Sequence, residues 1–428
     1  MFALIALAFF TMVLTGMPIA FALGLTGLLG LLMTMGTSLL MLVPQQIFSG
    51  MNSFVLMAIP LFLLSGELMN VSGITERIVR FTNTLVGHRK GGLGHVNIVA
   101  NIFMAGISGA AVADAAALGT MLIPAMNKSG YSRPYATALT GAASIIGPTI
   151  PPSMAMIVYG SVANTSIAGL FATGFLPGLF LGLLMMVLNH FISSRRGYQM
   201  QQQKASLGEV FRAMKDGLFA LGMPLIILGG ILSGIFTPTE AAGVAVGYSL
   251  FVGLFIFRTL TLSMIWQALK KTISISGVAL LLVSVGGILS WVLTVAQVPQ
   301  TIAAGILGIT GNKYVFLLLV CALLLVVGCF MDLTASIVIL TPILAPIAAQ
   351  MGIHPLHFGI TVVLALNIGL NTPPVGAVLF VVASIGQISM ESIIKEIWPF
   401  VLCQLGTLLL VALVPWFSLL VPRLLGLY

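Results

Sequence analysis

The sequence predicts an all-α integral membrane protein with inverted structural repeats, two re-entrant helical hairpins and two discontinuous helices. Three observations lead to this fold class. Of the 428 residues, 59% are apolar and only 6% are charged, whereas soluble domains carry about 25% charged residues. Apolar runs of about 20 residues, the length that spans a bilayer, recur along the chain. A set of glycines and prolines also occurs twice with the same internal spacing.

The repeated residues indicate an internal duplication. In each copy the later residues follow the first by 18, 41, 45 and 46 positions. The two copies are Gly106, Pro124, Gly147, Pro151 and Pro152, and Gly328, Pro346, Gly369, Pro373 and Pro374. Each copy joins a broken apolar segment to a second apolar segment that contains a Gly-x-x-x-Pro-Pro element.

The spanning helices follow from the apolar runs. They are expected, in chain order, near residues 4-35, 52-70, 133-160, 168-193, 217-236, 239-258, 273-298, 356-388 and 394-422. Two amphipathic segments, 73-88 and 259-271, are expected to lie along the cytoplasmic interface as bracing arms. The polar segment 194-216 is expected to be a cytoplasmic linker between a first repeat, 1-193, and a second repeat, 217-428.

Two further segments, 92-126 and 314-348, are expected to be the re-entrant hairpins. Small and polar residues break each one near its middle, which leaves two arms expected to be too short to cross a core about 30 Å thick. Non-helical backbone at membrane depth is tolerated only where protein or a water-filled cavity satisfies its polar groups. The breaks are therefore expected to line a binding site.

The orientation follows from the crossings and from the loop charges. Five predicted crossings lie between the hairpins, an odd number, so the hairpins enter from opposite faces and the duplication is inverted. One face is predicted to carry Arg77, Arg80, Arg89, Lys90, Lys128, Arg133, Arg195, Arg196, Lys204, Arg212, Lys215, Arg258, Lys270, Lys271 and Lys395. Only Lys313 and Arg423 fall on the other face. The positive-inside rule then places the N-terminus in the cytoplasm and the C-terminus outside.

The Pro-Pro elements within 133-160 and 356-388 predict cation sites. Proline has no amide hydrogen and disfavours helix in the residue before it, so tandem prolines leave preceding carbonyls unpaired. Unwound carbonyls coordinate alkali cations in transporters. We therefore expect one sodium ion between each hairpin tip and its Pro-Pro break. The alternative is that the glycines serve helix packing and the prolines only kink the helices.

The residues expected at these sites come from the tips and the breaks. Site one comprises Gly106, Ser108, Gly147 and Thr149, with Ser153 as a further candidate. Site two comprises Gly328, Gly369 and Thr372, with Asn371 and the Val375 carbonyl as further candidates. Sodium is the only metal expected, and no organic cofactor is expected.

Two carboxylates lie at the hairpin tips, and such groups at membrane depth are usually functional. Asp114 and Asp332 can each ligate an ion, carry a proton or cap the second hairpin arm, and for Asp332 capping is at least as well supported as ligation. Together with Gly109, Thr334 and Ser336, they are the candidates for contact with a substrate at the tips.

A hydrolase and a proton-coupled carrier are the alternatives to a sodium-coupled transporter. Gly106-Ile107-Ser108-Gly109 matches the G-x-S-G pattern of an intramembrane serine protease, which would make Ser108 a nucleophile. That chemistry needs a histidine base within hydrogen-bond reach, and the five histidines fall near loops or helix ends. A proton-coupled anion carrier is favoured if Asp114 or Asp332 titrates during turnover.

Several motifs resemble one known family over essentially the whole chain. They are Ala58-Ile59-Pro60-Leu61-Phe62, Ser65-Gly66-Glu67-Leu68-Met69-Asn70, Ser108-Gly109-Ala110-Ala111-Val112-Ala113-Asp114, Phe236-Thr237-Pro238-Thr239-Glu240-Ala241 and Asn371-Thr372-Pro373-Pro374-Val375-Gly376. In this order they resemble the large membrane subunit of tripartite ATP-independent periplasmic (TRAP) transporters.

The resemblance implies an elevator-type secondary transporter in a bacterial inner membrane. The hairpins and broken helices would form a mobile transport domain, and the other spans would form a scaffold. It further implies sodium-driven uptake of an organic acid, such as sialic acid or a C4-dicarboxylate, delivered by a periplasmic binding protein. A small four-helix membrane subunit is expected as a separate chain. The lipid bilayer is the remaining partner, and no nucleic acid is expected.

Overall fold

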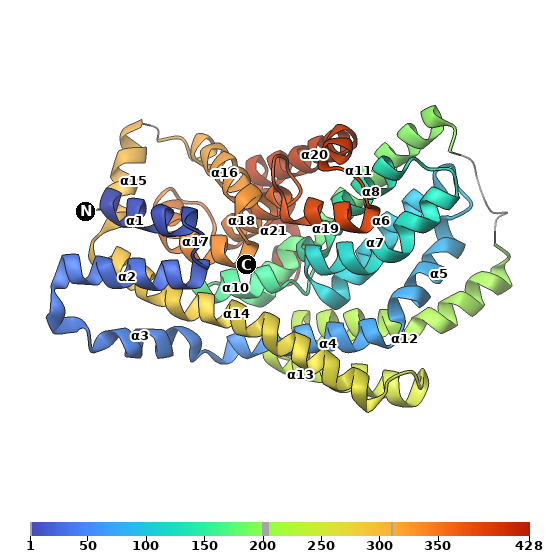
Figure 1. The fold of residues 1–428 in the computed structure, drawn as a ribbon, viewed down its shortest axis with the longest axis horizontal. Coiled ribbons are helices and arrows are strands. Elements are labelled where there is room, and N and C mark those ends of the chain that lie inside the picture. Colours follow the sequence, from blue (N-terminus) through green and yellow to red (C-terminus); the bar gives the residue numbers. More distant parts are fainter. Residues whose placement is uncertain (1, 199–204, 310) are drawn as a thin grey trace.

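Every regular element in the described part of the chain is a helix. The computed structural model describes residues 2–198, 205–309 and 311–428 (Figure 1). The first half contains α1 (Phe2–Leu14), α2 (Ile19–Met35), α3 (Leu42–Met51), α4 (Ala58–Val71), α5 (Ile74–Val86), α6 (Gly92–Ser108), α7 (Ala111–Lys128), α8 (Arg133–Ser144), α9 (Ile146–Thr149), α10 (Met154–Val162) and α11 (Ile167–Arg196).

The second half continues the pattern. It contains α12 (Leu207–Leu232), α13 (Pro238–Phe251), α14 (Leu262–Val295), α15 (Val298–Ile309), α16 (Lys313–Phe330), α17 (Leu333–Gln350), α18 (Pro355–Gly369), α19 (Ala377–Gly386), α20 (Met390–Leu413) and α21 (Pro415–Leu424). Among the described residues, seven helices are long and apolar enough to cross a membrane, or up to nine if each bent pair counts as one span. The protein is therefore an all-α, multi-pass membrane protein.

The helices of the two halves recur at one spacing. Moving the bounds of α7 by 222 residues gives the bounds of α17, and the same shift carries α10 to within two residues of α19. It also carries the short helix α5 onto α15, and it carries α11 onto α20 and the first residues of α21. The repeated glycines and prolines thus accompany a repeat of whole helices, while the repeat boundaries and their inversion stay predictions.

The two expected hairpins are present as helix pairs with two-residue breaks. Gly109 and Ala110 separate α6 from α7, and Met331 and Asp332 separate α16 from α17. However, α16 and α17 are each 18 residues long and apolar enough to cross a membrane. The expectation that all four arms are too short was therefore wrong for the second pair, and re-entry into the membrane stays a prediction.

Both expected discontinuous helices are confirmed. The first runs through α8 and α9, loses helical structure at residues 150–153 and resumes as α10 with a bend of 45°. The second stops at the end of α18 and resumes as α19 after residues 370–376. The Pro151–Pro152 and Pro373–Pro374 peptide bonds are both cis. The tandem prolines thus interrupt the helix at corresponding positions in the two halves.

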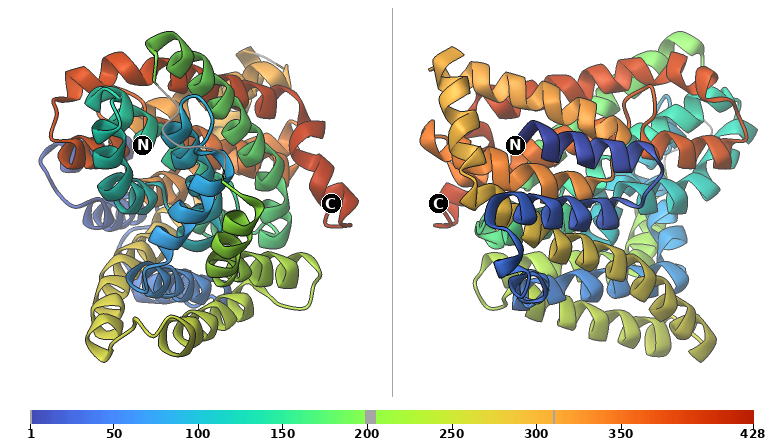
Figure 2. Two further views of the ribbon diagram at one scale, coloured as in Figure 1. Left: turned by 90° about the vertical axis from the view of Figure 1, so that its right-hand side faces the viewer. Right: turned by 60° about the vertical axis from the view of Figure 1, so that its left-hand side comes forward.

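The expected span 4-35 was wrong, because it forms two helices. Gly16 has a positive φ of 85°, and Pro18, which has no amide hydrogen, precedes α2. The chain turns back there, so that α1 and α2 lie side by side (Figures 1 and 2). Buried Phe9 and Leu23 belong to the apolar cluster shared by these two helices.

Four other segments differ from expectation. The segments 259-271 and 273-298 were expected to be an interfacial arm and a span, but they form the single 34-residue helix α14 because neither glycine nor proline separates them. The expected span 394-422 is divided between α20 and α21 at Val414 and Pro415. The expected linker 194-216 contains the end of α11 and the start of α12, and its residues 199–204 lie outside the described residues.

We divide the helices into two groups by their packing. We call α1–α5 and α12–α15 the frame, in which α14 packs along α2, α3 and α4, and α13 packs on α4. We call α6–α11 and α16–α21 the core unit, which contains both hairpins and both broken helices.

Hydrogen bonds join the two halves of the chain within the frame. Hydroxyl groups from the second half donate to backbone carbonyls of the first half at 2.7–3.2 Å. The pairs are Thr239 with Phe54, Ser249 with Ser65, Thr259 with Ser72, and Ser284 with Ile47. Lys271 also pairs with Glu67 at 2.5 Å, so the frame is held together by polar contacts as well as by apolar packing.

The core unit has its own polar contacts. Gln404 of α20 donates to the Ala142 carbonyl of α8 at 3.0 Å. Arg196 at the end of α11 makes a paired contact with the Glu396 carboxylate of α20, at 2.8 and 3.0 Å. Each contact joins a helix of the first half to a helix of the second half.

The boundary between frame and core unit differs from both interiors. Across this boundary, the described residues other than Asn83, Ser129 and Asn312 make no ion pair and no hydrogen bond between nitrogen or oxygen atoms. Among these residues, the one polar contact across the boundary joins Thr75 Oγ1 to Met104 Sδ at 4.0 Å. Glycines allow close approach instead: a Cβ at Gly66 would lie 2.8 Å from the Ile107 carbonyl oxygen. The two groups therefore meet through apolar atoms and backbone.

Candidate functional site at the hairpin tips

The first hairpin tip lies directly on the first Pro-Pro break. Gly109 follows α6 with φ of 59°, a left-handed conformation that favours glycine. A Cβ at this position would lie 2.5 Å from the Pro152 carbonyl oxygen. Only glycine therefore satisfies both the turn and the close approach, and the sequence-predicted pairing of tip and break is present in the structure.

Ser108, Asp114 and Gly147 come together at this contact. The Ser108 hydroxyl donates a hydrogen bond to Asp114 Oδ1. The other carboxylate oxygen, Oδ2, lies so close to the Gly147 Cα that a side chain at Gly147 would overlap it. Asp114 is fully buried and Oδ2 has no protein hydrogen-bond partner. Because an unpaired buried oxygen is costly, this atom marks a place for a proton or a cation.

The backbone at the first break adds further oxygen atoms. In a continuous helix the carbonyls of Gly147 and Pro148 would accept from the residues four positions later. Those residues are Pro151 and Pro152, which have no amide hydrogen. The first break thus adds carbonyl oxygens, which suit alkali cations, to a segment whose Gly147 lies against the Asp114 carboxylate.

The other candidates for site one have different surroundings. The Thr149 hydroxyl donates to the Ile145 carbonyl at 2.8 Å, and the Ser153 hydroxyl accepts from the Met156 amide at 3.4 Å as the N-cap of α10. The Cα of Gly106 faces Pro224 of the frame helix α12, where a Cβ would lie 2.4 Å from the proline ring. The side chains at these positions therefore serve local structure and packing.

At the second site, Gly328 and Gly369 form a helix crossing. A Cβ on Gly369 would lie 2.7 Å from the Gly328 Cα, so α16 and α18 touch backbone to backbone. The Gly369 carbonyl accepts from the Thr372 amide at 3.0 Å, and the Leu370 carbonyl accepts from the Val378 amide at 3.1 Å. This contact agrees with the alternative hypothesis, in which these two glycines serve helix packing.

Two buried amides lie at the second break. Asn367 and Asn371 are fully buried, and neither the oxygen nor the nitrogen of either side chain has a protein partner. The Asn371 oxygen faces Gly141 of α8, where a Cβ would lie 3.4 Å away. Asn367 was missed by the sequence analysis, although a lone amide in an apolar helix is a usable signal. Thr372 donates to the Ile368 carbonyl at 2.7 Å, and Val375 is half-buried.

Asp332 caps α17, which selects one of the roles left open for it. Its carboxylate accepts from the amides of Thr334 and Ala335 at 2.8 and 3.4 Å, and the residue is exposed. The Ser336 hydroxyl donates to the Asp332 carbonyl at 2.8 Å. The two aspartates are therefore not equivalent, because Asp114 is buried and caps nothing.

The second tip also contacts its own break. The Gly376 amide, just before α19, donates to the Cys329 carbonyl near the end of α16 at 3.0 Å. Each hairpin is thus tied to the Pro-Pro element of its own half. The first contact relies on a glycine turn and the second on a backbone hydrogen bond.

A cavity of about 30 Å³ lies beside the first tip, between the hairpin and α4. Ser108 and Asp114 line it from the core unit, and Glu67 and Asn70 line it from the frame. This volume has room for about two water molecules. The cavity brings polar groups of the frame to the edge of the Asp114 carboxylate.

Comparison with known proteins matches this chain to one family. Residues 6–417 match the family described as the tripartite ATP-independent periplasmic transporter, DctM component. The chain is 43% identical over 409 residues to the sialic acid TRAP transporter large permease protein SiaM of Vibrio cholerae, covering 96% of this chain and 95% of that protein. It is 37% identical over 405 residues to the C4-dicarboxylate TRAP transporter large permease protein DctM of Pseudomonas aeruginosa, covering 95% and 94%.

A solved structure has the same overall fold. The YdaH transporter of Alcanivorax borkumensis superposes with a TM-score of 0.65 over 90% of this chain and 89% of that one, at 15% sequence identity. Its fold supports the all-α membrane architecture described above. The relatives are transport proteins, and the Ser108 hydroxyl pairs with a carboxylate, so the hydrolase alternative is abandoned. The chain belongs to the DctM family of tripartite ATP-independent periplasmic transporters, and it is a membrane transport subunit rather than an enzyme.

Proposed function

We propose that this chain is the large permease subunit of a sodium-coupled secondary transporter that imports an organic acid. A periplasmic binding protein delivers the substrate, and a small four-helix membrane subunit, as a separate chain, completes the complex in the bacterial inner membrane. The N-terminus lies in the cytoplasm and the C-terminus in the periplasm. The observation that carries the proposal is the buried Asp114 oxygen without a protein partner, held between the first hairpin tip and its Pro-Pro break.

Sodium binds at both tips in this proposal, but through different ligands. At site one, Ser108, Asp114 and the carbonyls around Gly147 surround the ion, with Gly106, Thr149 and Ser153 supporting the backbone. At site two, the ligands come from Asn371 and from the backbone near Thr372 and Val375, while Gly328 and Gly369 allow the helices to approach. Site one contains the Asp114 carboxylate, whose negative charge compensates a cation, so it binds sodium more tightly than site two.

The substrate binds between the tips once sodium has ordered them. Helix N-termini and hydroxyl groups there favour a carboxylate. Gly109, Thr334 and Ser336 are the candidates for its contacts. Relatives named for sialic acid and for C4-dicarboxylates give the two substrate classes considered. Because coupling between sites is reciprocal, sodium raises substrate affinity and substrate raises sodium affinity by the same factor.

Transport proceeds by an elevator motion of the core unit against the frame. Each group has polar contacts of its own, whereas the boundary consists of apolar atoms and glycine contacts. A sliding step at such a boundary breaks almost no hydrogen bonds, so it leaves few buried polar groups unpaired. Sodium and substrate together permit the motion only because they bind the two end states with different affinity.

The test of sodium coupling is the thermal unfolding midpoint of the detergent-purified chain in sodium, compared with choline at equal ionic strength. Selective binding to the folded state raises the midpoint. We expect a sodium-specific rise that is lost in Asp114→Asn and reduced in Thr372→Ala. Thr361→Ala serves as the control, since its hydroxyl donates to its own helix away from both tips. Equal midpoints in sodium and choline would rule out a sodium site in the isolated chain.

A proton-coupled anion carrier is the second candidate, and Asp114 is again the reason for it. A buried carboxylate with one unpaired oxygen can bind a proton instead of a cation. Uptake into proteoliposomes of the assembled complex separates the two. Under the sodium proposal, a sodium gradient drives uptake at constant pH, and Asp114→Asn abolishes it. Uptake driven by a pH gradient in sodium-free buffer would establish proton coupling.

A further inference from the structure

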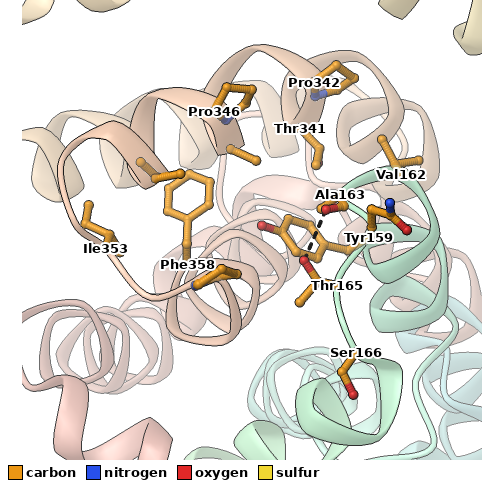
Figure 3. Close-up of a pocket in the computed structure, with 15 residues that line it drawn as sticks. Tyr159, Val162, Ala163, Thr165, Ser166, Thr341, Pro342, Pro346, Ile353 and Phe358 are labelled. Carbon is orange, nitrogen blue, oxygen red and sulfur yellow. Dashed lines mark hydrogen bonds between the residues drawn. The ribbon is translucent and has the colours of Figure 1, made fainter. Parts of the chain in front are cut away.

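Two carboxylates from different parts of the molecule line the small cavity beside the first hairpin tip. Asp114 lines it from the core unit, and Glu67 lines it from α4 of the frame. Two larger cavities, of about 470 and 230 Å³, have no Asp, Glu, Lys, Arg or His among the described residues that line them; Figure 3 shows the first of these. Of these three cavities, only the small one places charged groups of the frame and of the core unit opposite each other.

The carboxylate of the core unit has no countercharge. Asp114 is fully buried and forms no ion pair with any described residue, and its Oδ2 has no hydrogen-bond partner. An uncompensated buried charge is costly, so a cation beside Asp114 is stabilising. The proposed function identifies this cation as sodium.

The carboxylate of the frame, in contrast, has a countercharge of its own. Glu67 Oε1 lies 2.5 Å from Nζ of Lys271, which belongs to α14. The Glu67 side chain is 13% exposed and the Lys271 side chain is 54% exposed. Because Glu67 is mostly buried, water screens its charge only weakly, and Lys271 supplies most of the compensation. The frame therefore presents a nearly neutral pair to the cavity.

This neutrality matters because the two carboxylates belong to units that are proposed to move past each other. If Glu67 were unpaired, a cation beside Asp114 would be attracted by both carboxylates across a cavity of about 30 Å³. Such a cation would hold the core unit to the frame. Lys271 removes most of the attraction from the side of the frame, so the charge of Lys271 determines how tightly the boundary holds a cation.

We propose that the Glu67–Lys271 ion pair of the frame sets the sodium affinity of site one in the end state that the structure describes. Lys271 neutralises Glu67, so that sodium held by Asp114 exchanges with the solution instead of joining the core unit to the frame. Glu67 and Lys271 stay with the frame when the core unit moves, so any change in their charge acts on one end state alone. This inference rests on the proposed sodium coupling and adds two residues of the frame to it.

The experiment follows the thermal midpoint of the purified full chain as sodium replaces choline at constant ionic strength. Lys271→Met leaves the charge of Glu67 uncompensated and should tighten the apparent sodium affinity about 3- to 10-fold. Glu67→Gln leaves the positive charge of Lys271 beside the cavity and should weaken the affinity by a similar factor. The double variant Glu67→Gln/Lys271→Met restores neutrality and should return the affinity to that of the unaltered chain.

A purely structural link between α4 and α14 predicts a different result. Both single variants would then lower the midpoint in choline and leave the sodium affinity unchanged, and this outcome would overturn the inference. Because Lys271 is half-exposed, Lys271→Met is the variant expected to disturb folding least. It decides the question alone if Glu67→Gln does not fold.

The Arg196–Glu396 pair of the core unit is the matched control. It also joins two helices, at 2.8 Å, but neither residue lines any of the three cavities. Arg196→Met and Glu396→Gln should therefore leave the sodium affinity unchanged. Equal shifts from both ion pairs would show that sodium responds only to the net charge of the protein, which would contradict a local role for Glu67 and Lys271.

Uptake by the assembled complex gives a second readout. Tighter sodium binding in one end state alone shifts the equilibrium toward that state, so Lys271→Met should reduce uptake about 3-fold or more although it binds sodium more tightly. Unchanged or faster uptake by Lys271→Met would overturn the inference. A sodium response that is the same in every variant would refute this inference alone, whereas no sodium response in the unaltered chain would refute sodium coupling as well.

Discussion

At the scale of single residues, the first hairpin tip depends on glycine for two separate reasons. Gly109 needs a left-handed backbone, which costs an L-residue roughly 1–2 kcal/mol, and it also touches the Pro152 carbonyl. Gly130 shares only the first reason, since it has φ of 85° but open space where a Cβ would lie. Comparing substitutions at Gly109 and Gly130 therefore separates the effect of backbone strain from the effect of losing the contact with the Pro-Pro break.

We predict that Gly109→Ala lowers the thermal midpoint more than Gly130→Ala and also removes the sodium-induced rise. Both variants introduce the same strain, but only the first pushes the tip away from the Pro-Pro break, where the proposed ligands meet. Midpoints in sodium and choline for both variants provide the measurement. If Gly109→Ala kept the full sodium response, the tip contact would have no part in ion binding.

Single residues also show what can be predicted from the sequence and what cannot. Ser108, Asp114 and Gly147 could be chosen from sequence because polar residues in an apolar, repeated context are informative. The roles of Gly328 and Gly369 could not, because a glycine that lets helices touch looks the same in sequence as one whose carbonyl binds an ion. The distinction depends on which atoms lie opposite, and only the folded arrangement supplies them.

At the scale of helices, the start of α17 tests whether the two aspartates differ. Asp332 accepts hydrogen bonds from two backbone amides as an N-cap, and asparagine caps about as well as aspartate. We predict that Asp332→Asn keeps stability and uptake, whereas Asp332→Ala destabilises the protein by about 1 kcal/mol. Thermal midpoints and uptake by the assembled complex are the readouts. Loss of uptake in Asp332→Asn with an unchanged midpoint would instead assign the charge of Asp332 a functional role.

The errors in helix assignment also have physical causes. The expected span 4-35 is long enough to cross a membrane once, and only the Gly16 and Pro18 turn divides it into α1 and α2. The helix α15 was missed because its apolar residues continue from α14 with a break at Ala296 and Gln297 alone. By contrast, the amphipathic segment 73-88 does contain a helix, α5, whose polar face is marked by arginines, while its place at the cytoplasmic interface stays a prediction. Apolar content identifies membrane segments well, whereas turns within them depend on one or two residues.

At the scale of the whole molecule, the boundary between frame and core unit determines the proposed motion. Gly286 of α14 packs so closely on Val338 of α17 that a Cβ there would overlap the valine side chain. Gly277 lies on the same helix with no atom within 4 Å of a built Cβ. A substitution at one position therefore obstructs the boundary, and the same substitution at the other position does not.

We predict that Gly286→Val reduces uptake at least 10-fold while Gly277→Val retains most of it. Overpacking a close contact costs about 1–3 kcal/mol, which moves the core unit away from its resting position along α14. Uptake in proteoliposomes measures the effect, and sodium-dependent midpoints check that ion binding survives. Normal uptake by Gly286→Val would show that this contact is not on the path of the moving unit.

The hydroxyl groups of the second half that donate to first-half carbonyls in the frame have a consequence for biosynthesis. The carbonyls of Phe54 and Ser65 accept hydrogen bonds from Thr239 and Ser249, which are synthesised nearly two hundred residues later. During translation, α4 therefore enters the membrane before its partners exist, and the first hairpin is complete before the frame around it can close. Until the second half is made, the first half therefore lacks these hydrogen bonds of the folded frame.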